Sequence, residues 1–473
     1  MDKDKRRWWA LVVLCLGELM IVLDTTIVNV ALPSIQADLR FTDTALVWVV
    51  NAYMLTYGGF LLLGGRLGDL YGHRRLFLAG IVGFTLASLA CGWAPSQAVL
   101  VAARAVQGLG GAVVSAVALS LIMNLFPEPG ARARAMGVYG FVCAGGGSIG
   151  VLLGGLLTSE LSWHWVFLVN LPVGVGVFAA TRALVAGGRG DRSQPLDVAG
   201  AVTITASLML AVYAVVDGNR AGWGSAQTVG LLLAAAVLFA VFLGIESRVR
   251  SPLVPLAMFR IRNVAAANVV GVLWAASMFA WFFISALYLQ LVLKYTPLQV
   301  GLAFLPSNVI MAVLSLGWSA RLVMRYGFRP PLAGGLVLAA LGLALFARAP
   351  VDGSFWVDVF PGMVLLGVGC GVALNPVLLA ATSGMDEKDA GLASGVVNTS
   401  FMMGGALGLA VLASAAAART ASAQAAGAAE AAALGAGYQL AFAAGALCAM
   451  VAAAVAWLLR EAQPARQAAP AQP

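Results

Sequence analysis

Long apolar runs recur along the chain, and short polar segments separate them. A run of about 20 apolar residues is long enough to cross the ~30 Å hydrocarbon core of a bilayer as an α-helix. By this criterion we predict fourteen membrane-spanning helices, at residues 10–32, 46–64, 76–93, 99–123, 134–158, 163–185, 197–216, 227–246, 264–292, 299–319, 331–348, 357–380, 393–417 and 437–459. The pattern therefore predicts an all-α polytopic membrane protein embedded in a lipid bilayer.

Composition and charge agree with this class. The chain has 473 residues, of which 61% are hydrophobic and 10% charged, against roughly 45–50% and 25% in soluble proteins. Most of the 28 Lys and Arg residues fall in alternate loops and in the two tails, and such an excess marks the cytoplasmic side. Both termini are therefore predicted to be cytoplasmic. Because these charges lie in short loops, the net charge of +8 does not indicate nucleic-acid binding.

Residue types needed for other chemistry are scarce. The two histidines, His73 and His164, lie in or near loops on opposite sides, so no catalytic or metal-binding cluster is expected. The sequence contains no nucleotide-binding P-loop, and its five cysteines, all in apolar runs, indicate no disulfide framework. We therefore expect neither an enzyme nor a primary pump, and no metal or cofactor.

One short sequence occurs twice. Gly65–Arg75 (GRLGDLYGHRR) and Ala320–Pro330 (ARLVMRYGFRP) share Arg, Leu, Tyr, Gly and Arg at equivalent positions. The copies follow the second and tenth predicted spans, an offset that equals one six-helix bundle plus two helices. We therefore predict six-helix bundles at 1–186 and 263–473, with a linker and an inserted helix pair at 187–262. Parallel repeats of this kind place a substrate site near the middle of the membrane, between the bundles.

The first predicted span carries two acids, Glu18 and Asp24, and the fourth carries Arg104. A charge at the centre of a span costs at least about 2.5–3.5 kcal/mol, so each needs a partner or a water-filled cavity. At a rise of 1.5 Å per residue, Asp24 and Arg104 lie at the same depth, whereas Glu18 lies nearer the middle. We therefore predict that Asp24 pairs with Arg104, either as a proton-coupled pair or as a static link between two helices.

Glu18 has a different predicted setting. Thr25 and Asn29 fall on the same face of the helix as Glu18, and a polar stripe on a membrane helix favours a wet cavity over lipid. A carboxyl there could bind either a proton or a cationic substrate; the alternative is a carboxyl hydrogen-bonded within its own bundle. The other predicted lining residues are polar or aromatic residues of later spans, for which packing is the alternative role: Asn51, Tyr57, Tyr139, Trp281, Asn308 and Asn375.

Six motifs resemble those of the major facilitator superfamily, and more closely its fourteen-span drug:proton antiporter branch. They span most of the chain and are highly specific in combination: Gly65–Arg75, Leu23–Pro33 (LDTTIVNVALP), Arg104-x-x-Gln107-Gly108, Trp163–Gly174 (WHWVFLVNLPVG), Leu392–Ser400 (LASGVVNTS) and Gly404–Leu412 (GGALGLAVL). The resemblance implies the superfamily fold and multidrug efflux driven by inward proton flow, with a proton gradient in place of a cofactor. We expect bulky amphipathic substrates, cationic ones among them, and a monomer in a bacterial cytoplasmic membrane.

The resemblance also assigns roles to two groups of residues. In the loop after the second span it implies a cytoplasmic gate formed by Gly65, Asp69, Gly72, Arg74 and Arg75. A basic loop that only sets topology is the alternative, and Met324 replaces the acid in the second copy. In the fifth span, where Val151 replaces the usual proline, it implies helix packing through Gly146, Gly150, Gly154 and Gly155.

Two other functions share this fold and its gate loop. The chain could export one endogenous metabolite instead of many drugs, or it could take up a nutrient by proton symport. The motifs of the first, fifth and thirteenth spans argue against uptake.

Overall fold

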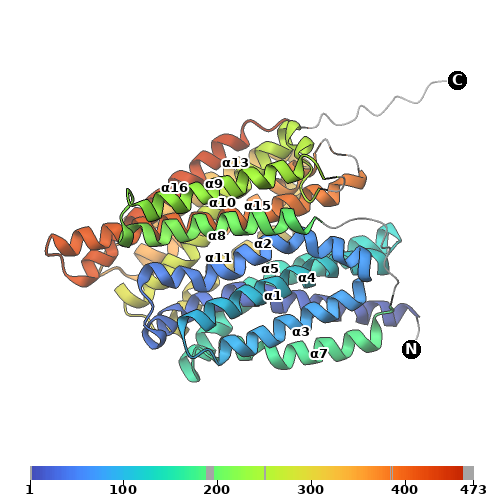
Figure 1. The fold of residues 1–473 in the computed structure, drawn as a ribbon, viewed down its shortest axis with the longest axis horizontal. Helices are drawn as coiled ribbons and strands as arrows, with labels where there is room; N and C mark the ends of the chain where they lie inside the picture. Colours follow the sequence, from blue (N-terminus) through green and yellow to red (C-terminus); the bar gives the residue numbers. More distant parts are fainter. Residues whose placement is uncertain (1–2, 188–196, 250–251, 384, 386, 462–473) are drawn as a thin grey trace.

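The computed structural model describes residues 3–187, 197–249, 252–383, 385 and 387–461, and within them the chain is helical with no strand. Long helices run side by side, and α1 begins at the same end of the molecule at which α16 finishes, which we call the termini end (Figure 1). The opposite end is the far end. The helices are α1 (Lys3–Leu39), α2 (Asp43–Tyr71), α3 (His73–Gly92), α4 (Gln97–Leu125), α5 (Pro129–Glu160), α6 (Trp165–Leu168), α7 (Asn170–Leu184), α8 (Val198–Ala221), α9 (Ala226–Glu246), η1 (Leu256–Arg260), α10 (Arg262–Leu287), η2 (Tyr288–Val292), α11 (Pro297–Val313), η3 (Leu314–Trp318), α12 (Ser319–Tyr326), α13 (Arg329–Phe346), η4 (Phe355–Val359), α14 (Phe360–Thr382), α15 (Glu387–Ala425) and α16 (Glu430–Ala456).

Twelve helices of the described residues are long and apolar enough to cross a membrane. The predicted spans 134–158 and 299–319 are also helical, but their apolar helices Ile149–Glu160 and Pro297–Val313 are shorter. The second of these continues through the π-helical turn η3 into α12. An all-helical fold with many candidate spans is therefore confirmed, while the count of fourteen stays a prediction.

The helix contacts repeat with the offset seen in the sequence. α1 packs on α5 as α10 packs on α15, and α3 packs on α4 as α13 packs on α14. Two further contacts, α2 on α15 and α5 on α11, join the first set of helices to the second. These two contacts are equivalent, because the offset makes α2 correspond to α11 and α5 to α15. This packing supports the predicted division into two bundles, whose boundaries stay predictions.

Glycines spaced four residues apart bring α5 close to α1. Gly146, Gly150 and Gly154 all face α1, and a Cβ on Gly146 would lie 2.9 Å from the Val22 side chain. Such small-residue spacing lets two membrane helices approach until their backbones nearly touch. The helix is unbroken at Val151, where the related motif has proline.

The two copies of the repeated sequence form the same kind of turn. α2 ends at Gly72 with φ of 92°, and α12 ends at Gly327 with φ of 78°. Residues with a Cβ rarely adopt this left-handed conformation, so glycine is needed at both positions. Gly65 lies about two turns earlier in α2, where its nearest neighbour is the side chain of Ala116 on α4.

The helices α8 and α9 pack on each other, and α8 also packs on α2 and α15 (Figure 1). Asn219 of α8 donates hydrogen bonds to the Ser414 carbonyl at 2.7 Å and to its hydroxyl at 2.9 Å. The inserted pair therefore covers one of the two contacts between the predicted bundles. The linker 188–196 that precedes it lies outside the described residues.

Candidate functional site

The structure brings Asp24 of α1 and Arg104 of α4 together as a buried ion pair. Their side chains are 0% and 1% exposed, and Arg104 Nη1 donates a hydrogen bond to Asp24 Oδ2 at 2.5 Å. The pairing expected from helix depth is therefore observed. Either charge alone would be costly inside a membrane, so the burial of each charge depends on the opposite charge beside it.

Neutral amides complete the surroundings of Asp24. Gln107 Nε2 and Asn170 Nδ2 donate to Asp24 Oδ1 at 2.7 and 3.1 Å, and both also donate to the Ser88 hydroxyl. The cluster therefore ties α1 to α3, α4 and α7. Gln107 lies three residues after Arg104, on the same helix face, so its part could have been predicted; Asn170 carried no such signal.

The Arg104 guanidinium has further polar and aromatic contacts. Its Nε donates to the Val49 carbonyl of α2 at 2.8 Å, and its Nη1 donates to Gln107 Oε1 at 2.6 Å. The guanidinium carbon lies 4.4 Å from the centre of the Tyr53 ring, a favourable cation–π distance. Together with the ion pair to Asp24, these contacts fix the position of the guanidinium.

Glu18 lies apart from this cluster and has fewer partners. Its side chain is buried, and its Oε1 accepts a hydrogen bond from the Ser115 hydroxyl of α4 at 3.1 Å. Tyr139 of α5 also interacts with the carboxyl, but Glu18 Oε2 accepts no hydrogen bond from any described residue. In this conformation Glu18 is therefore bonded within the first set of helices, with no described cation beside it.

Four predicted lining residues direct their polar atoms to backbone carbonyls: Thr25, Asn29, Asn51 and Asn375. Thr25 and Asn29 bond within α1. Asn51 is the most informative, because its Nδ2 donates to the Ala406 carbonyl of α15 at 2.9 Å. This bond joins α2 to α15 across the predicted boundary between the bundles.

The remaining predicted lining residues are buried among aromatic rings or lack a partner. Tyr57 stacks on Tyr53, with ring centres 5.8 Å apart, and Trp281 lies 5.6 Å from the ring of Phe304. Asn308 of α11 is 1% exposed, and its Nδ2 donates no hydrogen bond to any described residue. A buried amide without a partner is a donor that a ligand could use.

The predicted gate residues lie at the termini end. The Asp69 side chain is 61% exposed, and among the described residues it forms an ion pair with His73, at 3.2 Å. Arg74 Nη2 donates to the Arg182 carbonyl of α7 at 2.7 Å, and Arg75 is exposed. The described ion pairs of this loop therefore stay within the first set of helices, and gating stays a prediction.

Hydrogen bonds join the two sets of helices at the far end. The Leu298 N–H of α11 donates to the Ser159 hydroxyl of α5 at 3.0 Å, and Gln290 Nε2 donates to the Val30 carbonyl of α1 at 2.9 Å. Gly155 allows the first contact, because a Cβ there would lie 2.6 Å from a backbone oxygen of α11. The two sets of helices are thus hydrogen-bonded to each other at the end remote from the termini.

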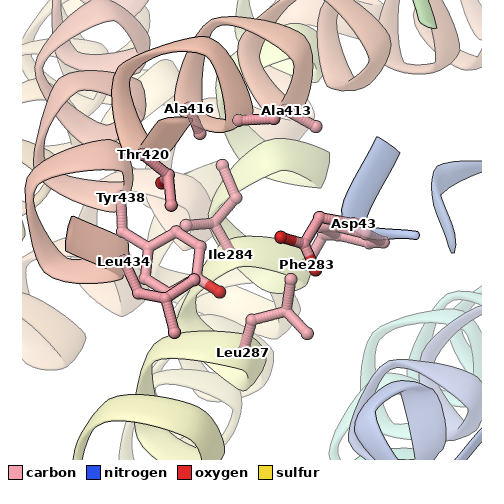
Figure 2. Close-up of a pocket in the computed structure, with 10 residues that line it drawn as sticks. Asp43, Phe283, Ile284, Leu287, Ala413, Ala416, Thr420, Leu434 and Tyr438 are labelled. Carbon is pink, nitrogen blue, oxygen red and sulfur yellow. The ribbon is translucent and has the colours of Figure 1, made fainter. Parts of the chain in front are cut away.

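A small pocket opens at the far end, between the start of α2 and helices α10, α15 and α16 (Figure 2). Asp43 and Tyr438 point into it from opposite sides, and most of the other lining residues are apolar. None of the predicted lining residues borders this pocket. It is therefore separate from the predicted substrate site.

The fold is that of a known class of membrane transporters. A crystal structure of a mutant of the nucleoside transporter NupG aligns with 96% of this chain and 100% of its own, with a TM-score of 0.68 at 13% sequence identity. At that identity the likeness concerns the fold alone.

The family model described as the Major Facilitator Superfamily matches residues 14–409, and the chain belongs to this family. It is 41% identical to the puromycin resistance protein pur8 of Streptomyces alboniger, over 88% of this chain and 83% of that protein. It is 40% identical to the cephamycin export protein CmcT of Amycolatopsis lactamdurans, over 87% and 85%. The tetracenomycin C resistance and export protein of Streptomyces glaucescens is 35% identical, over 88% and 77%. The chain is therefore a multi-pass transporter with antibiotic resistance and export proteins as relatives.

Proposed function

We propose that this protein is a proton-driven antiporter that exports amphipathic compounds, antibiotics and cationic drugs among them, by alternating access. It would act as a monomer in a bacterial cytoplasmic membrane, with the termini end in the cytoplasm. The named relatives support export, and the positive charge of the termini-end loops supports the orientation. One proton moving down ~100 mV releases about 2.3 kcal/mol, enough for about a fifty-fold gradient of a neutral substrate.

The observation that carries the proposal is the contrast between two buried acids on one helix. Asp24 is neutralised by Arg104 and accepts hydrogen bonds at both oxygens, so it fixes α1 to its neighbours. Glu18 accepts a hydrogen bond at Oε1 from the neutral Ser115 and interacts with the neutral Tyr139, while its Oε2 has no hydrogen-bond partner among the described residues. An ionised Glu18 would be uncompensated, so a proton or a cationic substrate can compete for it.

The second set of helices supplies a different wall. Trp281 and Phe304 provide aromatic surface, and the buried Asn308 amide provides a donor without a described partner. Apolar surface with a few placed polar groups is typical of small-molecule sites. Such a wall suits bulky amphipathic cargo, and alternating access would expose it first at the termini end and then at the far end.

The test is a drug-susceptibility panel in an efflux-deficient bacterial host. We expect the wild-type protein to raise tolerance to several amphipathic compounds. Asp24→Asn leaves a buried Arg104 uncompensated, at a cost of about 3–5 kcal/mol, and should abolish tolerance. Asp217→Asn is the control, because Asp217 accepts from the exposed Gln227 at the far end of α8.

A second measurement isolates the competition at Glu18. Membrane vesicles carrying Glu18→Gln should bind a cationic probe more weakly and move it without a response to the pH gradient, since the amide has no negative charge and cannot release a proton. The competition model is wrong if these vesicles transport the probe in a proton-coupled manner at the wild-type rate.

Export of a single endogenous metabolite is the second candidate. The relatives named for cephamycin export and for tetracenomycin C export favour it, since each name gives one compound. A panel in which wild type and Asp24→Asn give the same tolerance to every compound would favour this dedicated function over multidrug efflux.

A further inference from the structure

The inserted helix pair holds a second site of buried acids, distant in sequence from the transport cluster. Asp197 immediately precedes α8 and Glu246 ends α9, and these residues are 4% and 3% exposed. Each carboxyl group acts electrostatically on the other across the start of α8. Both lie over Gly200, where a Cβ would be 2.6 Å from Asp197 Oδ2 and 2.8 Å from Glu246 Oε1.

One oxygen of each acid has a backbone donor, and the other has none among the described residues. Asp197 Oδ1 accepts from the Gly200 N–H at 2.7 Å, and Glu246 Oε2 accepts from the Val254 N–H at 3.1 Å. Asp197 Oδ2 and Glu246 Oε1 are buried and accept no hydrogen bond from these donors. Two ionised oxygens in that position would repel each other while being deprived of water.

No cation among the described residues compensates this pair. None of their ion pairs involves either acid, and the charged group that acts on Glu246 is Asp197 itself. Among the described residues, Arg248 follows α9 and is exposed, and Arg66 and Asp69 lie in the last turns of α2, which packs on α8. Asp197 Oδ2 and Glu246 Oε1 therefore both lack a hydrogen-bond donor among the described residues.

We propose that Asp197 and Glu246 bind one proton in common, held between Asp197 Oδ2 and Glu246 Oε1. The proton makes one oxygen a donor and the other an acceptor, so both buried atoms gain a partner and the net charge of the pair falls to −1. This site is independent of the proposed export function and of the acids on α1.

The bound proton stabilises the contact between the inserted helices and the segment that contains Leu253 and Val254, which leads to α10. Val254 donates to Glu246, and its neighbour Leu253 packs with Leu63 of α2 and Ala201 of α8. Leu63 lies just before the predicted gate loop. Release of the proton as pH rises would therefore loosen α8, α9 and this segment beside the gate.

The experiment is thermal unfolding of the purified full-length protein in detergent, from mildly acidic to mildly alkaline pH. The stability that the shared proton supplies is present at low pH and lost as pH rises, so the wild-type Tm should fall by at least about 2 °C. Glu246→Gln should flatten this change, because its amide can donate to Asp197 Oδ2 while its oxygen accepts from Val254. Asp197→Asn should do the same and keeps the acceptor for Gly200.

The matched control is Asp217→Asn at the other end of α8, which should retain the wild-type dependence on pH. The proposal is overturned if Glu246→Gln or Asp197→Asn, whichever yields folded protein, unfolds with the wild-type pH dependence. It is also overturned if sodium, compared with choline, raises the alkaline Tm of the wild type but not of Glu246→Gln, since the site would then hold a metal cation.

Discussion

The two copies of the repeated loop share a turn but differ in what holds it. In the first copy Asp69 supplies the acid, is largely exposed, and pairs with His73 of the same loop. In the second copy Met324 stands in its place, 79% exposed. There the acid comes from Glu461, after α16, whose carboxylate accepts from the two backbone N–H groups at the start of α13, at 3.3 and 2.8 Å.

The difference shows that a repeated sequence need not carry a repeated role. Asn263 at the start of α10 exchanges hydrogen bonds with the backbone of Arg460, so the segment after α16 is bonded to a second helix as well. The second loop is therefore held by the protein's own C-terminal segment. The first loop is instead bonded to α7, through Arg74 and the Arg182 carbonyl.

The largest expected effect on stability is that of Gly327→Ala. A Cβ costs roughly 1–2 kcal/mol in the left-handed conformation, and here it would also displace the Glu461 carboxylate that lies against Gly327. Gly72→Ala should carry a similar backbone strain without disturbing Glu461, and should lower the Tm less. Gly334→Ala, in α13 with no atom within 4 Å of the new Cβ, is the control. Equal decreases of the Tm for Gly72→Ala and Gly327→Ala would show that Glu461 does not make the second loop different from the first.

Glu461→Gln should have a smaller effect, of about 1 kcal/mol, because a charged acceptor at a helix N-terminus is replaced by a neutral one. The measurement is again the Tm, with Glu430→Gln, an exposed acid in the first turn of α16, as the control. A Tm that does not distinguish these two variants would show that the C-terminal segment does not hold the second loop.

The smallest effect on stability is expected for Asp69→Asn, within about 0.5 kcal/mol, because the side chain is exposed. Its effect should fall on transport instead, which we expect to slow in vesicles while the Tm is unchanged. Transport at the wild-type rate would mean that this loop sets topology and has no part in gating.

Depth along a helix was sufficient to predict the central ion pair. A span has a fixed rise per residue, so Asp24 and Arg104 could be placed at one level before any contact was known. The four-residue spacing of Gly146, Gly150 and Gly154 likewise indicated a close helix contact, and the structure shows the helix they meet.

Partners from distant parts of the chain could not be found in this way. Asn170, Glu461 and the pair Asp197 and Glu246 reach their partners through tertiary packing, which helical periodicity does not encode. The angular stripe of Glu18, Thr25 and Asn29 predicted a common face, but not that Thr25 and Asn29 would direct their polar atoms to the backbone of α1.

The glycine contact between α5 and α1 has a mechanical consequence. Because α5 contributes glycine backbone to this interface, it has few side-chain torsions there that could absorb a displacement. A displacement of α1 would therefore be passed on to α5, from the level of Glu18 to the contact between Gly155 and α11 at the far end. A movement of α1 that follows a change of charge at Glu18 would then also change the contact between α5 and α11.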